Sequence, residues 1–195
     1  MSAPVGGRGP CVALLELASI AVGIETTDAL SKEAAVDVIE ARSVSPGKFL
    51  ILFTGPVEEV TSALRRGLEI GADFLIDRLF IPNLEPTLYG LIRGDREPMQ
   101  PAVGELHAVG LIETLSVAST IRAADIASKT ASMSLVTLEL AKGIGGKSWV
   151  AMTGDVADVE AGVEAGSADA EAAGLLVARV VIPRPHGNLR DLLDS

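Results

Sequence analysis

The residues with the clearest chemical potential lie in one glycine-rich loop. Residues 141–148, AKGIGGKS, fit a relaxed phosphate-binding pattern in which four residues separate an Ala or Gly from Gly-Lys-Ser. In such a loop, backbone amides surround phosphate, Lys147 reaches the β- and γ-phosphates and Ser148 binds magnesium. That chemistry needs a helix at the Lys-Ser pair, whereas residues 148–153, SWVAMT, are a short β-prone run. A tight glycine turn between two strands is the stronger interpretation, and nucleotide hydrolysis is the weaker one.

The other reactive side chains do not form a recognisable catalytic group. His107 and His186 are far apart in sequence and have no metal-ligand spacing, and His107 is expected to be solvated. Glu16 and Glu113 end two similar predicted strands, where a structural hydrogen bond is a better interpretation than catalysis. The single Cys11 excludes an internal disulfide, fits a reducing compartment and is expected to be a quiet structural thiol. We therefore expect no catalytic residues, no metal and no cofactor.

The elements that position these residues occur twice, because the chain contains an internal repeat. The segment VALLELASIAVGIETTDALSKEA from Val12 aligns with VGLIETLSVASTIRAADIASKTA from Val109, at an offset of 97 positions. Further on, GKFLILFTGPVEEV from Gly47 aligns with GKSWVAMTGDVADV from Gly146, at an offset of 99. A repeat of this length decides the architecture, and it predicts two domains of roughly 85–90 residues each.

Each copy predicts the same order of elements, β-α-β-β-α-β. Apolar and small residues recur at spacings of three and four along both first helices, which predicts helices over 20–34 and from Val117 onward. The first copy predicts strands at 12–17, 36–44, 48–53 and 75–81, and a second helix that begins near Val57. This order predicts an α+β fold of two tandem ferredoxin-like split βαβ domains, each an antiparallel sheet with helices on one face. The other face must meet water or a partner.

The predicted domains are residues 11–93 and 102–195. The linker between them is residues 94–101, GDREPMQP, which is polar and contains proline as domain boundaries often do.

Composition excludes several classes of partner. The net charge of −10 argues against nucleic acid and against an anionic membrane surface. No uninterrupted apolar run reaches the roughly 18 residues of a membrane-spanning helix. The N-terminus, MSAPVGGRGP, lacks the apolar region of a signal peptide. We therefore expect a cytoplasmic protein whose mean hydropathy of +0.40 reflects cores and interfaces.

Five short strings in the second copy carry a family resemblance. They are LIET (111–114), AAD-x3-K-x-A (123–131), G-x-G-G-K (143–147), GDV (154–156) and VIPRPH (181–186). In this order and spacing they closely resemble the bacterial microcompartment (BMC) shell domain. The first copy matches more loosely, with LLEL, DALSKEA, SPGK, TGPV and IPN. Two fused copies resemble the tandem-domain, trimer-forming class, and most of all its members from propanediol-utilising compartments.

The resemblance implies a structural role in assembly. Three chains would form a homotrimer with a pseudo-sixfold ring of domains, a flat tile that packs with other hexameric and pentameric shell tiles. In the family, the helix lysine and the arginine of the PRPH string lie at tile edges. The residues at or near those positions here are Lys32, Lys129, Arg184 and His186. The first copy has Asn83 where the second has Arg184, so alternate edges are expected to differ chemically.

The resemblance also places the strand-turn-strand loops at a central opening. The pore-lining residues expected from the first copy are Ser43, Val44, Ser45, Pro46 and Gly47. The second loop, with Gly143, Ile144, Gly145 and Gly146, either lies near the pore or folds aside.

Some relatives have a cysteine at the position of Ser45, and three such thiolates hold an iron–sulfur cluster. A neutral hydroxyl is a poor substitute, so we expect no cluster and a small polar pore for polar metabolites. The rival hypothesis, a small-molecule sensor built from duplicated split βαβ domains, rests on the fold alone.

Overall fold

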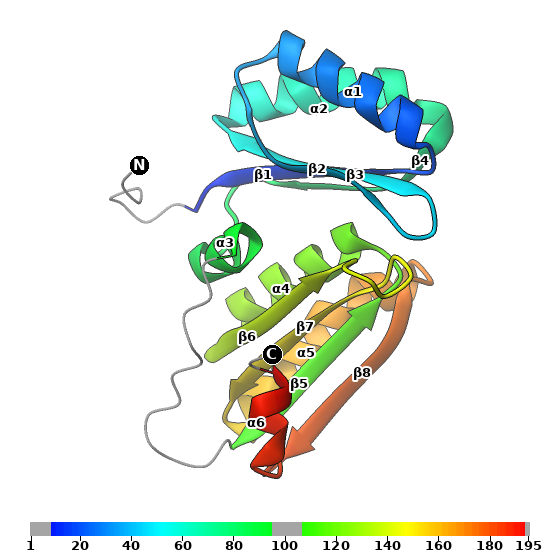
Figure 1. Ribbon diagram of the computed structural model, residues 1–195. Coiled ribbons are helices and arrows are strands. Elements are labelled where there is room, and N and C mark those ends of the chain that lie inside the picture. Colours follow the sequence, from blue (N-terminus) through cyan, green and yellow to red (C-terminus); the bar gives the residue numbers. More distant parts are fainter. Residues whose placement is uncertain (1–8, 95–106, 194–195) are drawn as a thin grey trace. The chain divides into compact units, whose positions relative to one another are not determined.

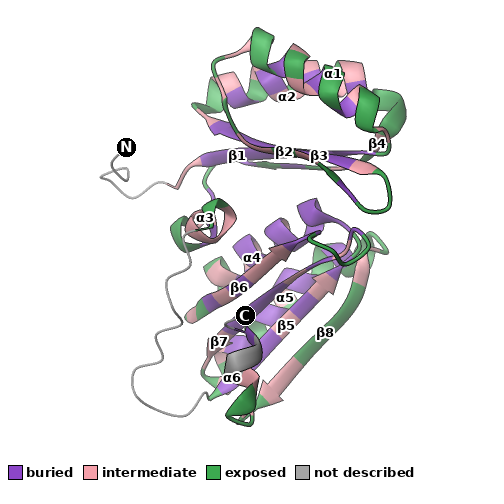
Figure 2. Cartoon of the chain, in the orientation of Figure 1, coloured by how far each residue is buried: buried purple, intermediate pink, exposed green. Residues whose placement is uncertain are grey.

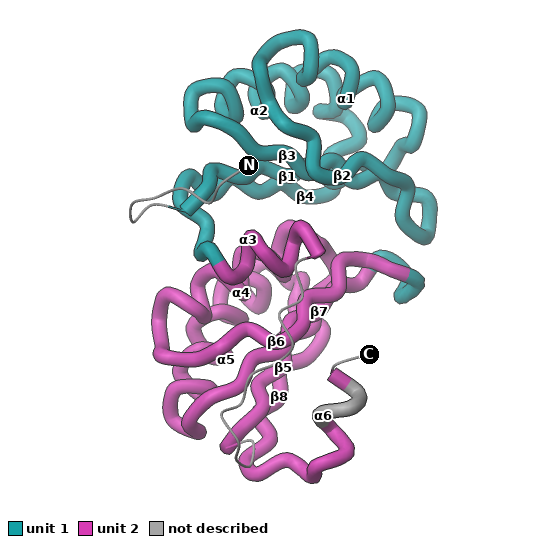
Figure 3. The backbone as a smooth tube through the Cα atoms, turned by 60° about the vertical axis from the view of Figure 1, so that its left-hand side comes forward, with its two compact units in different colours: residues 1–86, 143–146 teal, residues 87–142, 147–195 magenta. Residues whose placement is uncertain are grey.

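The computed structural model describes residues 9–94 and 107–193, apart from the side chains of residues 190–192. The chain divides into two compact units, residues 1–86 with 143–146 and residues 87–142 with 147–195 (Figure 3). Each unit contains one four-stranded antiparallel sheet (Figure 1).

In the first unit all the predicted strands and helices are present. The strands are β1 (Cys11–Leu17), β2 (Asp37–Val44), β3 (Lys48–Gly55) and β4 (Leu75–Ile81). The helices are α1 (Ile20–Glu33), α2 (Val57–Gly71) and the short 3-10 helix η1 (Ala72–Phe74). The sheet order is β2-β3-β1-β4, so the first strand of the copy is central.

The second unit repeats this arrangement. Its strands are β5 (Ala108–Thr114), β6 (Met133–Leu140), β7 (Ser148–Gly154) and β8 (Leu176–Pro183), in the order β6-β7-β5-β8. Its main helices are α4 (Val117–Thr130) and α5 (Val156–Ala172). The shared strand order confirms the predicted α+β fold of two tandem split βαβ domains.

Two short helices were not expected from the sequence. Helix α3 (Pro86–Arg93) follows the closing strand of the first copy, and α6 (Asn188–Leu193) follows that of the second. Leu189 and Leu193 of α6 pack with Val109 and Ala151 on the side of the second sheet opposite α5 (Figure 1). The hydroxyl of Thr137 donates to the Leu193 carbonyl at 2.6 Å, which fastens the end of α6 to β6. The prediction that this face carries no helix is therefore wrong for the second sheet, because α6 covers part of it.

The start of the first helix is fixed in the same way in both copies. The Ser19 hydroxyl accepts a hydrogen bond from the Val22 amide at 3.3 Å, and the Ser116 hydroxyl accepts one from the Ser119 amide at 3.0 Å. Each serine thereby satisfies one of the amides that a helix N-terminus leaves without a partner. The repeat thus conserves a capping residue as well as the helix that follows it.

The core of the first unit lies between its sheet and its two helices. One face of β1 presents Cys11, Ala13, Leu15 and Leu17, which cluster with Leu30, Phe49, Ile51, Phe53, Val60 and Ala63. Alternate residues of a strand point to opposite faces, so Val12, Leu14 and Glu16 lie on the face without α1 and α2. Every residue of β1 is buried (Figure 2).

The apolar stripe that predicts α1 coincides only in part with the face that α1 buries. Leu30 of this stripe is buried, but Ile20 is 42% exposed and Ile24 is 59% exposed. The other buried residues of α1 are Gly23 and Thr26. In α4 the residues equivalent to Ile20 and Ile24, Val117 and Ile121, are fully buried. The two copies therefore share the helix but differ in how much of it is covered.

One packing exchange distinguishes the two copies. A Cβ atom at Gly23 would lie 2.4 Å from Phe49 side-chain atoms, so α1 can pass over this ring only at a glycine. The second copy has Thr120 at the glycine position and Ser148 at the phenylalanine position, and both are fully buried. The first copy thus pairs a glycine with a phenylalanine, whereas the second pairs a threonine with a serine.

The predicted domain limits, 11–93 and 102–195, stay a prediction. Residues 95–101 of the predicted linker lie outside the described residues. Across the described parts of the chain, no helix has both the length and the apolar character needed to span a membrane.

Candidate functional site

The turn between β2 and β3 contains the first set of residues expected at a pore. Ser45, Pro46 and Gly47 are exposed, and the Gly47 amide donates to the Val44 carbonyl at 3.0 Å. Gly47 has a φ of 94°, a backbone conformation that glycine adopts without steric cost. Of the two residues that precede the turn, Ser43 is exposed and Val44 is buried. The turn therefore presents one hydroxyl, a proline ring and backbone groups to its surroundings, with no charged side chain.

The longer loop between β6 and β7 has several residues in the left-handed backbone conformation. Positive φ values occur at Ala141, Gly143, Gly145 and Gly146, and Gly143, Ile144 and Gly145 are exposed. Strand β7 begins at Ser148, as the glycine-turn interpretation expects. A phosphate-binding loop would need a helix N-terminus at this point. The fold therefore lacks the element on which the nucleotidase hypothesis depends.

An ion pair of Glu and Lys lies at the base of each loop. Lys48 Nζ is 3.7 Å from Glu16 Oε2, and Lys147 Nζ is 3.1 Å from Glu113 Oε1. The internal repeat predicts that Glu16 and Glu113 are equivalent, but it does not predict their pairing with Lys48 and Lys147.

The strand register explains both pairs. Glu16 lies opposite Leu50 and Glu113 lies opposite Trp149, so each lysine, two residues earlier, is a diagonal neighbour on the same face. The repeat correctly indicates that the two glutamates are equivalent. Their lysine partners could be identified only with the register of the strand pairs.

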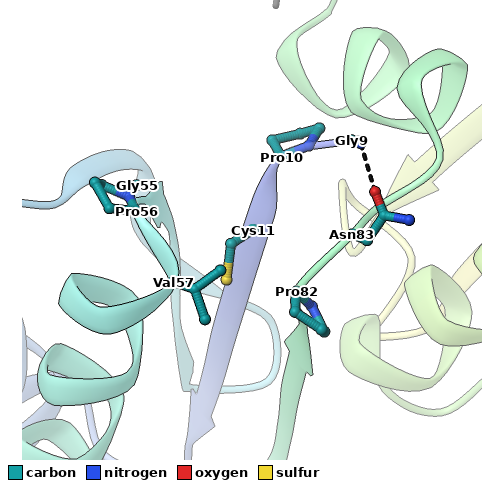
Figure 4. Close-up of a pocket in the computed structure, with 8 residues that line it drawn as sticks. All are labelled: Gly9, Pro10, Cys11, Gly55, Pro56, Val57, Pro82 and Asn83. Atoms are coloured by element: carbon teal, nitrogen blue, oxygen red, sulfur yellow. Dashed lines mark hydrogen bonds between the residues drawn. The ribbon is translucent and has the colours of Figure 1, made fainter. Parts of the chain in front are cut away.

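A pocket lies at the corner of the first unit, where β1, β3 and β4 approach one another. It has a volume of about 480 Å³ and is lined mainly by glycine and proline residues together with Cys11, Val57 and Asn83 (Figure 4). Asn83 accepts a hydrogen bond from the Gly9 amide. Cys11 is 4% exposed, and burial raises the pKa of its thiol. The thiol is therefore protonated at neutral pH, as expected for a structural cysteine.

The equivalent corner of the second unit contains a histidine and a carboxylate. His107 Nδ1 lies 2.8 Å from Asp155 Oδ1, and its carbonyl accepts from the Arg184 amide at 2.9 Å. Arg184 is exposed and adopts a φ of 48°, which is uncommon outside glycine. His186 is also exposed and its Nδ1 accepts from the Asn188 amide at 3.3 Å. The exposure of His107 agrees with the prediction, whereas its partner Asp155 was not anticipated.

The helix lysines expected at tile edges form the same intrahelical pair in each copy. Lys32 contacts Asp28, and Lys129 Nζ lies 2.7 Å from Asp125 Oδ2. The environments differ, because the Asp28 side chain is 61% exposed and that of Asp125 is 9% exposed. Both ammonium groups remain accessible to solvent, as an edge contact would require.

The residues present do not fit a cluster held by thiolates. Cys11 is the only cysteine of the chain, and it lies opposite Gly55, at the far end of β3 from Ser45. Among the residues that the structure describes, no group of three or more His, Cys, Asp or Glu side chains is placed to hold a metal ion.

The sequence and the fold both match proteins of known family. Residues 11–84 and 108–185 each match the BMC domain. The chain is 41% identical to the bacterial microcompartment shell protein PduT of Citrobacter freundii over 178 residues, which cover 91% of this chain and 94% of PduT. It is also 43% identical over 88 residues to the shell protein EutM of Escherichia coli, covering 45% of this chain and 88% of EutM.

A crystal structure of a microcompartment protein from Desulfitobacterium hafniense superposes with a TM-score of 0.80 at 43% identity. The match covers 94% of this chain and 99% of that protein. With both halves matched and one relative aligned along nearly its whole length, the chain belongs to the BMC-domain family of microcompartment shell proteins, with two domains in tandem.

Proposed function

We propose that three copies of this chain form a pseudo-hexameric tile in the shell of a cytoplasmic bacterial microcompartment. The structural shell role follows from the two BMC domains and from the full-length similarity to PduT. The tile assembles with other hexameric and pentameric shell proteins, and its central opening passes small polar metabolites. The protein performs no chemistry itself. Nothing about the relatives named above favours the sensor hypothesis.

The observation that carries the trimer is the uncovered side of α1. Ile20 and Ile24 are exposed, whereas their equivalents Val117 and Ile121 are buried. Large apolar side chains exposed side by side mark a surface that a partner covers. In a closed ring of repeated domains, the first helix of every domain has an equivalent environment. A neighbouring copy of this chain is therefore the partner that would bury Ile20 and Ile24.

The second sheet offers a surface of matching character. Val180 is 45% exposed and pairs with the partly buried Leu111 on the face that α6 covers in part. An apolar helix stripe on one chain and an apolar strand face on the next form a heterologous contact, which closes into a ring when its rotation is suitable. We propose that this contact repeats three times in the tile.

The turn at Ser43–Gly47 supports a small polar opening. Its exposed groups are serine hydroxyls, backbone groups and the Pro46 ring, none of which is charged. The polar groups exchange hydrogen bonds with hydrated metabolites without attracting charge of either sign. Three copies around a threefold axis present three Ser45 hydroxyls. The loop at Gly143–Gly146 either joins this opening or lies aside, and variants of the two loops distinguish these arrangements. We propose no iron–sulfur cluster, because the opening has serine where a thiolate is needed.

The proposed tile edge carries exposed polar and basic side chains. Lys32, Lys129, Arg184 and His186 are all exposed, and the family resemblance places these positions at or near tile edges. The neutral Asn83 corner of the first copy, engaged with the Gly9 amide, gives the tile two chemically distinct kinds of corner.

Native mass spectrometry of the purified protein tests the trimer directly. The expected species has a mass of about 60 kDa, three times the 20.1 kDa of one chain, and electron microscopy of concentrated protein is expected to show flat sheets. A protein that stays monomeric or dimeric at high concentration overturns the proposal.

A further inference from the structure

The duplicated ion pair at the base of the two loops has a different environment in each copy. The side chains of Glu16 and Lys48 are 1% and 19% exposed. Those of Glu113 and Lys147 are 35% and 44% exposed, at the shorter distance of 3.1 Å. The first pair is therefore a buried element of the fold, whereas the second is reached by solvent and by solutes.

Each lysine directly follows the loop proposed to lie at the opening. Residues 43–47 carry no charged side chain, and neither do residues 143–146. Lys48 and Lys147 are the first charged residues after these loops, and in a trimer each occurs three times. Rings of lysine or arginine select anions in pores, so the charge state of this position matters for what passes.

We infer that Glu16 and Glu113 determine the selectivity of the proposed opening by neutralising the lysine at the base of each loop. The paired carboxylate cancels the ammonium charge, so solutes are sorted by size and hydrogen bonding instead of by sign. This inference rests on the proposed function, because it needs an opening lined by these loops. It assigns a role to two glutamates that act through their lysines.

The difference in burial decides which glutamate can be tested. Glu16 is fully buried, and loss of one partner from a buried pair leaves a charge without compensation and is strongly destabilising. Glu113 is partly exposed, so Glu113→Gln keeps the shape of the side chain and leaves the Lys147 ammonium in contact with water. Lys142, at the other end of the second loop, is exposed and is the same in every variant, so its charge is a constant background.

The test compares the reversal potential of trimers in a planar lipid bilayer under a potassium chloride gradient. We expect Glu113→Gln to raise the ratio of chloride to potassium permeability about threefold, the size of effect that an ion pair of this exposure carries. Lys147→Gln leaves the carboxylate alone and is expected to shift the ratio in the opposite direction. The double variant Glu113→Gln/Lys147→Gln is expected to return to the wild-type ratio.

Glu171→Gln is the matched control. Glu171 also forms a partly exposed ion pair, with Arg179 Nη1 at 3.0 Å, but that pair lies between α5 and β8. The variant changes the net charge by the same amount, so a general charge effect would appear in both proteins.

The outcomes distinguish a failure of this inference from a failure of the proposed function. Wild-type protein that forms no trimer, or trimers that conduct no ions, overturn the proposed function and the inference with it. Trimers that conduct with the same reversal potential in wild type, Glu113→Gln and Lys147→Gln overturn the inference alone. If Glu113→Gln does not fold, the sign of the Lys147→Gln shift decides: a shift toward potassium supports the inference, and no shift refutes it.

Discussion

Replacement of Ile24 by serine is the sharpest test of the proposed assembly surface on α1. The side chain is 59% exposed in the single chain, so most of its apolar area is available to a neighbouring copy. Complete burial of an isoleucine side chain contributes about 1.5–3 kcal/mol, so burial of this exposed part contributes about 1.3 kcal/mol. Isoleucine and serine have similar helix propensities, so α1 itself is expected to form as before.

In the proposed trimer this effect is multiplied, because three such contacts would form in each tile. A loss of about 4 kcal/mol corresponds to a roughly thousandfold change in the constant for dissociation into three monomers. Since that constant scales with the square of concentration, the midpoint of dissociation is expected to move to a roughly thirtyfold higher protein concentration. A dilution series followed by sedimentation velocity or native mass spectrometry measures this midpoint.

Ile76→Ser provides the matched control for this experiment. Ile76 belongs to the same unit and is 40% exposed, but it lies on β4. We expect its dissociation midpoint to equal that of the wild type. If Ile24→Ser trimers dissociate at the same concentration as wild type and Ile76→Ser, the stripe on α1 is not the surface that holds the trimer.

Three further predictions concern the edge, the turn and the packing of α1. Lys129→Ala or Arg184→Ala is expected to weaken sheet assembly in electron micrographs and leave the trimer intact in native mass spectra; mutants that tile normally would refute the edge assignment. Ser45→Cys, reconstituted anaerobically with iron and sulfide, is expected to gain a brown cluster, and colourless protein would place this position off the axis. Gly23→Ala is expected to destabilise the first unit by about 1–2 kcal/mol in urea unfolding, since crowding against Phe49 outweighs the gain in helix propensity; Phe49→Leu in the same chain should recover part of the loss, and full additivity would contradict the contact.

The sequence predicted the strands, the main helices and their duplication because each has a strong local signal. The apolar run of β1, the helical spacing of apolar and small residues in the first helices, and the glycine turns are properties of a few neighbouring residues. The short helices α3 and α6 were missed, although Leu88, Leu91 and Ile92 and the equivalent leucines of α6 have the helical spacing of three and four.

The face of α1 could not be predicted from periodicity. The stripe with Ile20 and Ile24 is apolar, but Gly23 and Thr26 face the core because small residues let the helix lie close to the sheet. Periodicity records that a face is apolar, whether the same chain or another one covers it. Likewise, the pairing of Glu113 with Lys147 depends on the register of β5 against β7, which a single strand does not contain.

The exchange between Gly23 with Phe49 and Thr120 with Ser148 restricts how the two halves of this gene can recombine. A crossover that transferred α4 into the first copy without its strand would place a branched threonine where the Phe49 ring already fills the space. The reverse transfer would leave glycine beside serine and create a void. The first helix and the third strand of each copy therefore have to be exchanged together if the packing of either half is to be kept.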